Sequence, residues 1–152
     1  MKTKTLKEVT LEEMLEVAKF LVTEEAKQMG KFVYNLKMEE IDGERVKKDK
    51  YWIKVENGEV SWGEGHLDDP EATLFTVNRG GVDTLLAMQI YGLKAATNAM
   101  LLGYISASDL KKAQKWFKLL KWGEDEVIEG FKKLGIEIKD LSLDIYEELQ
   151  LE

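Results

Sequence analysis

Two loops in the middle of the chain hold the side chains with the clearest capacity for chemistry. In the first loop His66, the only histidine, lies close to Asp68 and Asp69. An imidazole beside carboxylates can transfer protons or bind a metal ion. This cluster lacks the ligand spacing of a zinc site, however, and Gly- and Asp-containing segments commonly form solvated turns. We therefore expect neither a catalytic residue nor a metal site at His66.

The second loop, Arg79-Gly80-Gly81, comes directly before a segment with helical periodicity. Backbone N–H groups at the start of a helix are free to bind an anion such as a carboxylate or phosphate group. A turn from a strand into a helix also requires small residues, which gives a purely structural explanation for the glycines. Arg79, Gly80 and Gly81 are nevertheless the best polar candidates for contact with the head group of a ligand.

The rest of the catalytic inventory is thin. The chain has no cysteine, which excludes thiol nucleophiles, disulfides and cysteine metal sites. The glycines near positions 80, 92 and 103 are too dispersed for a dinucleotide-binding or phosphate-binding loop. The serines lack the nucleophile-elbow pattern; they are Ser61, Ser106, Ser108 and Ser142. We therefore expect a protein that is not an enzyme and that needs no cofactor.

Length and charge narrow the function classes further. A chain of 152 residues can form one domain with a full hydrophobic core. The formal net charge of −7, with both signs mixed along the chain, argues against nucleic acid as a partner. Residues 1–13 are too polar for a secretory signal, and no apolar run is long enough to span a membrane. We expect a cytoplasmic protein without stable membrane insertion.

The first structural segment is predicted to be a long amphipathic helix. Thr10-Leu11-Glu12-Glu13 has the spacing of a capping box. Apolar residues then recur on one helical face as far as Gly30; they are Leu11, Met14, Leu15, Ala18, Leu21, Val22, Ala26 and Met29. This pattern predicts a helix of about five turns that covers the core.

Strands follow from Lys31, where the apolar period changes to two. The Asn57-Gly58 pair favours a tight type I′ turn, which would pair Val55 with Val60 and Ile53 with Trp62. The segment 72–78 predicts another strand. Together with the helix before them, these strands indicate an α+β fold with an antiparallel sheet covered mainly on one face.

The second half of the chain predicts mostly helices. Apolar periodicity indicates helices at 82–90, 95–102, 110–122 and 125–134, with a short strand at 104–108. The last residues, 136–152, fit either a strand or a final helix. No linker or internal repeat divides the chain, so we expect a single domain over residues 1–152.

The helix predicted at 110–122 carries five lysines among its aromatic residues. Its period is that of an amphipathic helix, so the lysines are interpreted as a solvated face rather than a nucleic-acid surface. Two tryptophans on one short helix, Trp116 and Trp122, could mark a partly exposed apolar surface. A homodimer through these residues is therefore possible.

Five segments between Tyr51 and Trp122 share an order and a spacing with a known family. They are the apolar strand ending in Val55-Glu-Asn-Gly58, the strand Asp69-Pro-Glu-Ala-Thr-Leu-Phe-Thr-Val77, the helix Val82-Asp-Thr-Leu-Leu-Ala-Met88, the pair Gly92 and Gly103, and Gly103-Tyr-Ile-Ser-Ala-Ser-Asp109 followed by the helix from Leu110. In these features the chain resembles the sterol-carrier-protein type 2 family. It departs from the family at Ala95-Ala96, where relatives often have Asn-Pro.

The resemblance implies a fold and a function. The fold would be a five-stranded, mostly antiparallel sheet with helices packed to leave an apolar tunnel for a fatty acid, a fatty acyl-CoA or a sterol-like lipid. The residues expected to line it are Ile53, Val60, Trp62, Phe75, Val77, Leu86, Ile90, Met100, Ile105 and Phe117. Methionines in the lining would tolerate varied ligand shapes.

The sequence leaves three functions open. The first is a non-enzymatic carrier of an apolar ligand, which is the expectation. The second is a non-catalytic interaction or dimerisation module with the same fold and a filled core. The third is an acyl-processing enzyme with His66 or Arg79 in its site.

Overall fold

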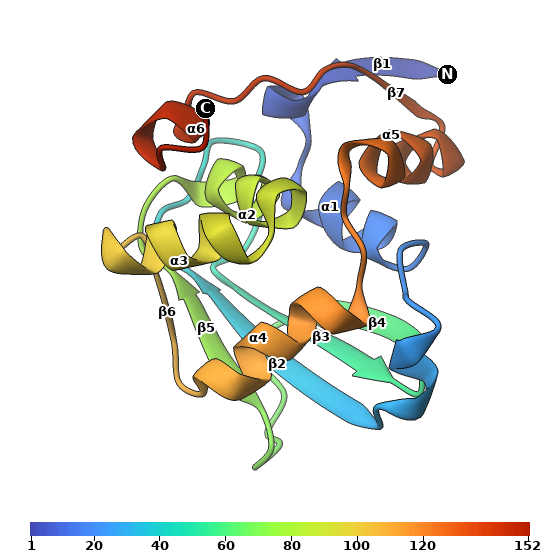
Figure 1. Cartoon of the computed structure of the whole chain (residues 1–152), viewed down its shortest axis with the longest axis vertical. Helices are drawn as coiled ribbons and strands as arrows, with labels where there is room; N and C mark the ends of the chain where they lie inside the picture. The colour runs from blue at the N-terminus through green and yellow to red at the C-terminus, as the bar shows by residue number, and fades with distance from the viewer.

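The structure is a computed structural model that describes all residues, 1–152 (Figure 1). Strands and helices alternate along the chain in the order β1 (Lys2–Thr5), the 3₁₀ helix η1 (Leu6–Glu8), α1 (Leu11–Ala18), the 3₁₀ helix η2 (Glu25–Gln28), β2 (Lys31–Met38), β3 (Lys50–Glu56), β4 (Glu59–Glu64), β5 (Thr73–Val77), α2 (Gly81–Tyr91), α3 (Leu93–Leu101), β6 (Ile105–Ala107), α4 (Leu110–Leu119), α5 (Glu124–Lys133), β7 (Ile136–Asp140) and α6 (Ile145–Glu148).

The central sheet has five strands in the order β4-β3-β2-β5-β6. Its pairs are antiparallel except for β2 and β5, which run parallel. Asn57 and Gly58 both have positive φ and form the two-residue turn that the sequence predicts. Val55 accordingly pairs with Val60, and Ile53 with Trp62. The α+β fold with a mostly antiparallel sheet is confirmed.

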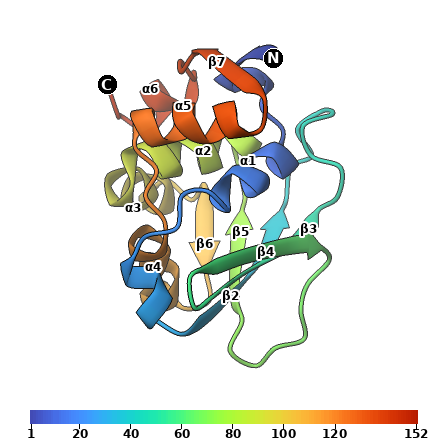
Figure 2. The same cartoon turned by 90° about the vertical axis from the view of Figure 1, so that its right-hand side faces the viewer.

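The helices lie mainly on one side of this sheet (Figure 2). Alternate side chains of the inner strands point toward them and are buried; on β2 and β3 they are Tyr34, Leu36, Met38, Tyr51, Ile53 and Val55. The loop between β4 and β5 packs near β2, where Asn35 Nδ2 donates to the Leu67 carbonyl oxygen and Asn35 Oδ1 accepts from the Leu67 N–H, both at 3.0 Å. Burial is therefore concentrated between the sheet and the helices.

The first helix is shorter than its periodicity predicts. It begins with the expected capping box at Thr10, but it ends at Ala18. Beyond that point Val22 forms a β-bridge with Leu120, and Thr23 Oγ1 donates to the Lys118 carbonyl oxygen at 2.6 Å. The prediction of a continuous helix to residue 29 is wrong, because a long-range backbone contact replaces the helical hydrogen bonds there. Only the short η2 turn is helical in this part of the chain.

The later elements follow the prediction more closely. Helices α2, α3 and α5 and strand β6 occupy the predicted segments, whereas α4 ends at Leu119 and not at Trp122. The segment 136–152, for which two interpretations were open, contains both a strand and a short helix. Strand β7 pairs in parallel with β1, so Lys2 lies opposite Ile136. None of the helices has the length and hydropathy that crossing a bilayer requires.

Arg45 ties the N-terminal segment to the start of α2. Its Nε donates to the Val9 carbonyl oxygen at 2.9 Å. Its Nη1 forms ion pairs with Asp42 Oδ2 at 3.1 Å and with Asp83 Oδ1 at 2.8 Å. Burial raises the pKa of Asp83, an effect that the bond from Arg45 opposes. Arg45 therefore acts as a structural link beneath α2, with its donors used inside the protein.

Candidate binding cavity

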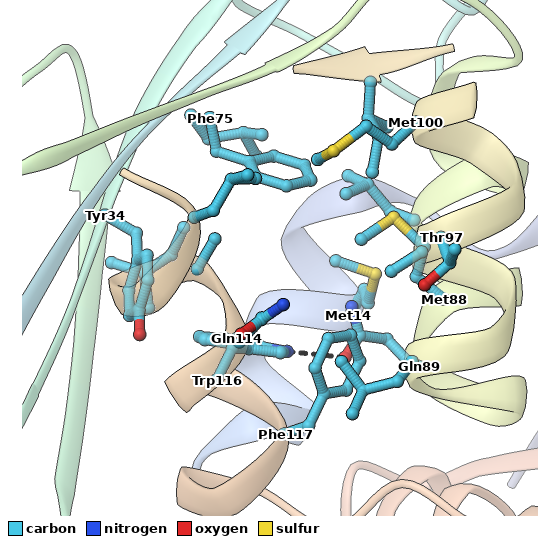
Figure 3. Close-up of a pocket in the computed structure, with 18 of the residues that line it drawn as sticks. Met14, Tyr34, Phe75, Met88, Gln89, Thr97, Met100, Gln114, Trp116 and Phe117 are labelled. Carbon is cyan, nitrogen blue, oxygen red and sulfur yellow. Dashed lines mark hydrogen bonds between the residues drawn. The ribbon is translucent and has the colours of Figure 1, made fainter. Parts of the chain in front are cut away.

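An apolar cavity of about 280 Å³ lies between the sheet and the helices (Figure 3). Twenty residues line it, of which seventeen are hydrophobic, and none carries a charge. The sheet contributes Tyr34, Leu36, Ile53, Phe75 and Ile105. Helices α1 to α4 contribute the remaining residues, so the cavity occupies the interior position where the sheet and the helical layer meet.

Two helices form its walls for different reasons. Eight of the eleven residues of α2 are buried, so this helix can present Leu85 and Met88 to the cavity while other side chains pack into the core. Helix α4 is amphipathic, and Ala113 and Phe117 lie on its apolar face, four residues apart. The lysines of α4 consequently lie toward solvent.

The cavity opens between α3 and α4. Every lining residue that is exposed to solvent comes from these two helices; they are Leu93, Thr97, Leu101, Leu110 and Gln114. Leu101 is 81% exposed, which is unusual for a leucine beside a cavity. The rim of the opening is therefore itself largely apolar.

The structure brings together five of the ten residues that we expected to line a tunnel. They are Ile53, Phe75, Met100, Ile105 and Phe117. The strand alternation and the helical period place these side chains on inward faces, which is why simple periodicity finds them. Their role in binding stays a prediction.

The other five do not line the cavity, and that part of the prediction is wrong. Val60 and Trp62 lie on the edge strand β4, where Trp62 Nε1 donates to Glu16 Oε1 at 2.7 Å. Val77 and Leu86 are 1% and 0% exposed and pack into the solid core, as Ile90 does at its margin. Inward orientation alone does not separate a core position from a cavity wall.

The Arg79 loop does not line the cavity, so the expected contact of Arg79, Gly80 and Gly81 with a ligand head group stays a prediction that the cavity does not support. The Arg79 guanidinium lies 5.2 Å from the centre of the Tyr104 ring, and the Gly80 N–H donates to a carboxylate oxygen of Glu40 at 3.2 Å. The Asp42 side chain crowds Gly81. The carboxylates of Glu40 and Asp42 thus lie at the N-terminus of α2, where they would repel a bound anion.

Polar groups inside the cavity were not found from the sequence. Gln89 on α2 is only 6% exposed, and its Oε1 accepts a hydrogen bond from Trp116 Nε1 at 2.7 Å. Tyr34 donates from its hydroxyl to the Lys112 carbonyl oxygen at 2.7 Å and packs edge-on against Trp116. Burial raises the pKa of the Tyr34 phenol far above its ordinary value, so it stays neutral. The one sign of these polar groups in the sequence is Gln89 itself, a single glutamine among the apolar residues of α2.

Two other side chains discussed above lie outside the cavity. His66 is exposed, and its Nε2 lies 3.0 Å from the Leu36 carbonyl oxygen. Trp122 is buried at 5% exposure, and the Trp116 indole is held by Gln89. Trp122 is therefore not part of an exposed apolar surface, whereas Trp116 is half-buried, and a homodimer stays a prediction.

Neither the models of known protein families nor the sequences of curated proteins match this chain.

Proposed function

We propose that this protein binds and carries an apolar small molecule in the cavity between the sheet and α2, α3 and α4, without chemical conversion. The observation that supports this most directly is an uncharged, mostly hydrophobic cavity that opens to solvent. A natural protein interior is close-packed, and an opening of this size carries a cost in lost contacts. A ligand that fills it would restore those contacts.

The volume favours a flexible chain of moderate length over a sterol. At roughly 30 Å³ for each water-sized group, the cavity of 280 Å³ holds about nine such groups. A rigid sterol ring system with its tail needs more space than this. The occupant that fits is an alkyl or acyl chain, any longer part of which would leave through the opening between α3 and α4.

Such a chain gains enough free energy to bind reversibly. About nine methylene groups, at ~0.8 kcal/mol each, give about 7 kcal/mol from removal of apolar surface from water. The loss of translational and rotational freedom opposes this by at least about 4 kcal/mol. Weak to moderate affinity is the expected regime, and it suits a carrier that must also release its ligand.

The polar lining supports binding over catalysis. Apart from the neutral Tyr34 phenol, it consists of two amides and one hydroxyl, from Gln89, Gln114 and Thr97. None of these groups exchanges protons near neutral pH. A non-catalytic interaction module with a filled core is less favoured, because the interior of this protein contains a cavity. Membership of the sterol-carrier-protein type 2 family stays a prediction.

Displacement of the fluorescent dye N-phenylnaphthylamine by primary alcohols of increasing chain length tests the proposal. Affinity should rise about fourfold with each added methylene and should level off near about nine carbons, where the cavity is full. Protein purified without detergent should also retain a bound small molecule in native mass spectrometry. Absence of displacement by every chain length, together with no bound mass, would overturn the proposal.

A further inference from the structure

The hydrogen bond between Trp116 and Gln89 fixes the orientation of the Gln89 amide. An indole N–H can only donate, so the group that faces Trp116 Nε1 at 2.7 Å must be the Gln89 carbonyl oxygen. The Nε2 amino group is consequently turned away from Trp116. Figure 3 shows this pair at the cavity wall, next to Met14 and Phe117.

The two N–H groups of Gln89 Nε2 have no acceptor within the protein, since the bond to Trp116 is the only one that the side chain makes. Gln89 is 94% buried, but Nε2 is not a fully buried atom, so it keeps accessible surface at the cavity that Gln89 lines. A donor that faces a largely apolar cavity without a protein acceptor is free to bond a ligand. The other polar side chains differ, because Tyr34 already donates to a backbone carbonyl and Thr97 and Gln114 lie at the exposed rim.

We propose that Gln89 Nε2 binds an uncharged oxygen acceptor, such as a ketone, ester or hydroxyl oxygen, on the buried part of the ligand. This inference rests on the proposed function and adds a polar selectivity to it. An ionised carboxylate is a poor fit at this depth, because no charged residue lines the cavity to compensate its desolvation. The preferred ligand is therefore an oxygen-bearing neutral chain rather than a fatty acid anion.

Methyl heptyl ketone, nonane and nonanoate are matched probes, since their chains fit the cavity. After correction of each affinity for the probe's transfer from water to hexane, competition against N-phenylnaphthylamine should rank the ketone first, at least about fivefold tighter than the alkane, as one made hydrogen bond implies. Nonanoate should bind most weakly at neutral pH. The infrared C=O stretching band of the bound ketone should lie at lower frequency than that of the same ketone in hexane.

Gln89→Leu removes the donor and keeps a side chain of similar size. In this variant the preference for ketone over nonane should disappear and the C=O band should return to its position in hexane, while nonane still binds. Gln28→Leu makes the same substitution at an exposed position outside the cavity and should leave both readouts unchanged. Gln89→Met provides a second apolar replacement if the leucine variant folds poorly.

The outcomes separate this inference from the proposed function. If no probe displaces the dye from the wild-type protein, the proposed function fails. If all probes bind but the ketone has neither an advantage nor a shifted band, the role of Gln89 is wrong while the carrier function stands. A preference for the ketone that persists in Gln89→Leu would also overturn the proposed role of Gln89.

A second inference comes from the charge around the cavity opening. Residues 93–122, which contain α3 and α4, carry six lysines and a single acid, Asp109, for a net charge of +5. The remaining residues must therefore carry −12 to give the total of −7. Four of these lysines are exposed and lie within ion-pair distance of no carboxylate; they are Lys94, Lys111, Lys115 and Lys118.

Exposed leucines accompany these lysines. Leu93, Leu101, Leu102 and Leu110 are all at least 50% exposed, and three of the four line the cavity. Lysines beside exposed apolar side chains match the interface of an anionic bilayer, where lysines meet phosphate groups and leucines enter the acyl boundary. We infer that this rim docks on anionic phospholipid membranes, with the cavity opening toward the lipid.

Sedimentation with vesicles of phosphatidylcholine, with and without phosphatidylglycerol, tests this docking. Binding should require the anionic lipid, should weaken with added salt, and should fall about fivefold for each lysine neutralised in Lys111→Gln and Lys115→Gln. Leu101→Gln should weaken binding as well, whereas Lys54→Gln on the sheet should not. Equal binding to neutral vesicles, no binding to either, or a dimer in light scattering that these rim variants dissociate would each overturn the inference.

Discussion

Filling part of the cavity should stabilise the unliganded protein and weaken ligand binding at the same time. Ala113 on α4 lines the cavity between Leu110 and Phe117. Ala113→Leu adds three carbon atoms, or about 90 Å³ at roughly 30 Å³ for each group, which is about a third of the cavity of 280 Å³. The substitution therefore tests whether the space is empty in solution and whether a ligand uses it.

The two effects have calculable sizes and opposite signs. At ~24 cal/mol per Å³ of cavity removed, the free energy of unfolding should rise by about 2 kcal/mol, less about 1 kcal/mol if the leucine is strained. Since 1 kcal/mol corresponds to about 2–4 °C in a domain of this size, Tm should rise by about 2–8 °C. Three fewer methylenes of ligand should fit, which lowers affinity about fiftyfold.

Calorimetric unfolding without ligand and displacement of N-phenylnaphthylamine by nonanol measure the two quantities. Ala72→Leu, outside the cavity, is the matched control and should change neither in this way. A lower Tm together with unchanged affinity would refute the reasoning, because it would mean that the position is already packed solid. Higher stability with unchanged affinity would show that the ligand binds elsewhere.

Three further results are expected from urea unfolding. Gly130→Ala should destabilise the protein, because the added Cβ would lie 2.8 Å from Val17 Cγ1 and overpacking costs about 1–3 kcal/mol. This cost should exceed the ~1 kcal/mol by which alanine favours a helix over glycine. A more stable variant would contradict the close contact between α5 and α1. Leu149→Ala, at a fully buried position, should cost about 2–5 kcal/mol, whereas Leu101→Ala at the exposed rim should cost little. Burial disfavours the Glu13 carboxylate, but the hydrogen bonds that it accepts from Lys4 and Thr10 outweigh burial and lower its pKa. The ionised carboxylate therefore stabilises the folded protein above the ordinary pKa of 4.5, and this stabilisation is lost as pH falls through the lower pKa of the folded state. Glu13→Gln should therefore flatten the decline in stability below pH 4.5, and an unchanged slope would count against this ion pair.

The sequence predicts those elements whose stability is local. The Asn57-Gly58 turn sets the register of β3 and β4 by its own backbone preference, and Asp109 caps α4 as its side chain and position suggest. The break after Ala18 was not predictable, because it depends on Leu120, about a hundred residues away in the chain. Likewise, the pairing of β1 with β7 requires two segments that have no strong strand pattern of their own.

The site was partly predictable for a related reason. Periodicity identifies inward faces, and so it finds Ile53 and Phe117, but it cannot say where packing leaves a gap. Leu86 and Val77 are as apolar as the true lining residues and yet lie in filled core. The orientation of Gln89 depends on a donor contributed by α4, which is known only once α2 and α4 are placed together.

The parallel pairing of β1 with β7 has a consequence for how the chain folds. Lys2 and its partner Ile136 are about 130 residues apart in the sequence. The central sheet and the helices that line the cavity lie entirely between these strands in sequence. Because loop closure over such a separation is slow and entropically costly, this two-stranded sheet should form last. In native-state hydrogen exchange, amides of Lys4 and Ile138 should then open before those of Ile53, as a separate unit of low local stability.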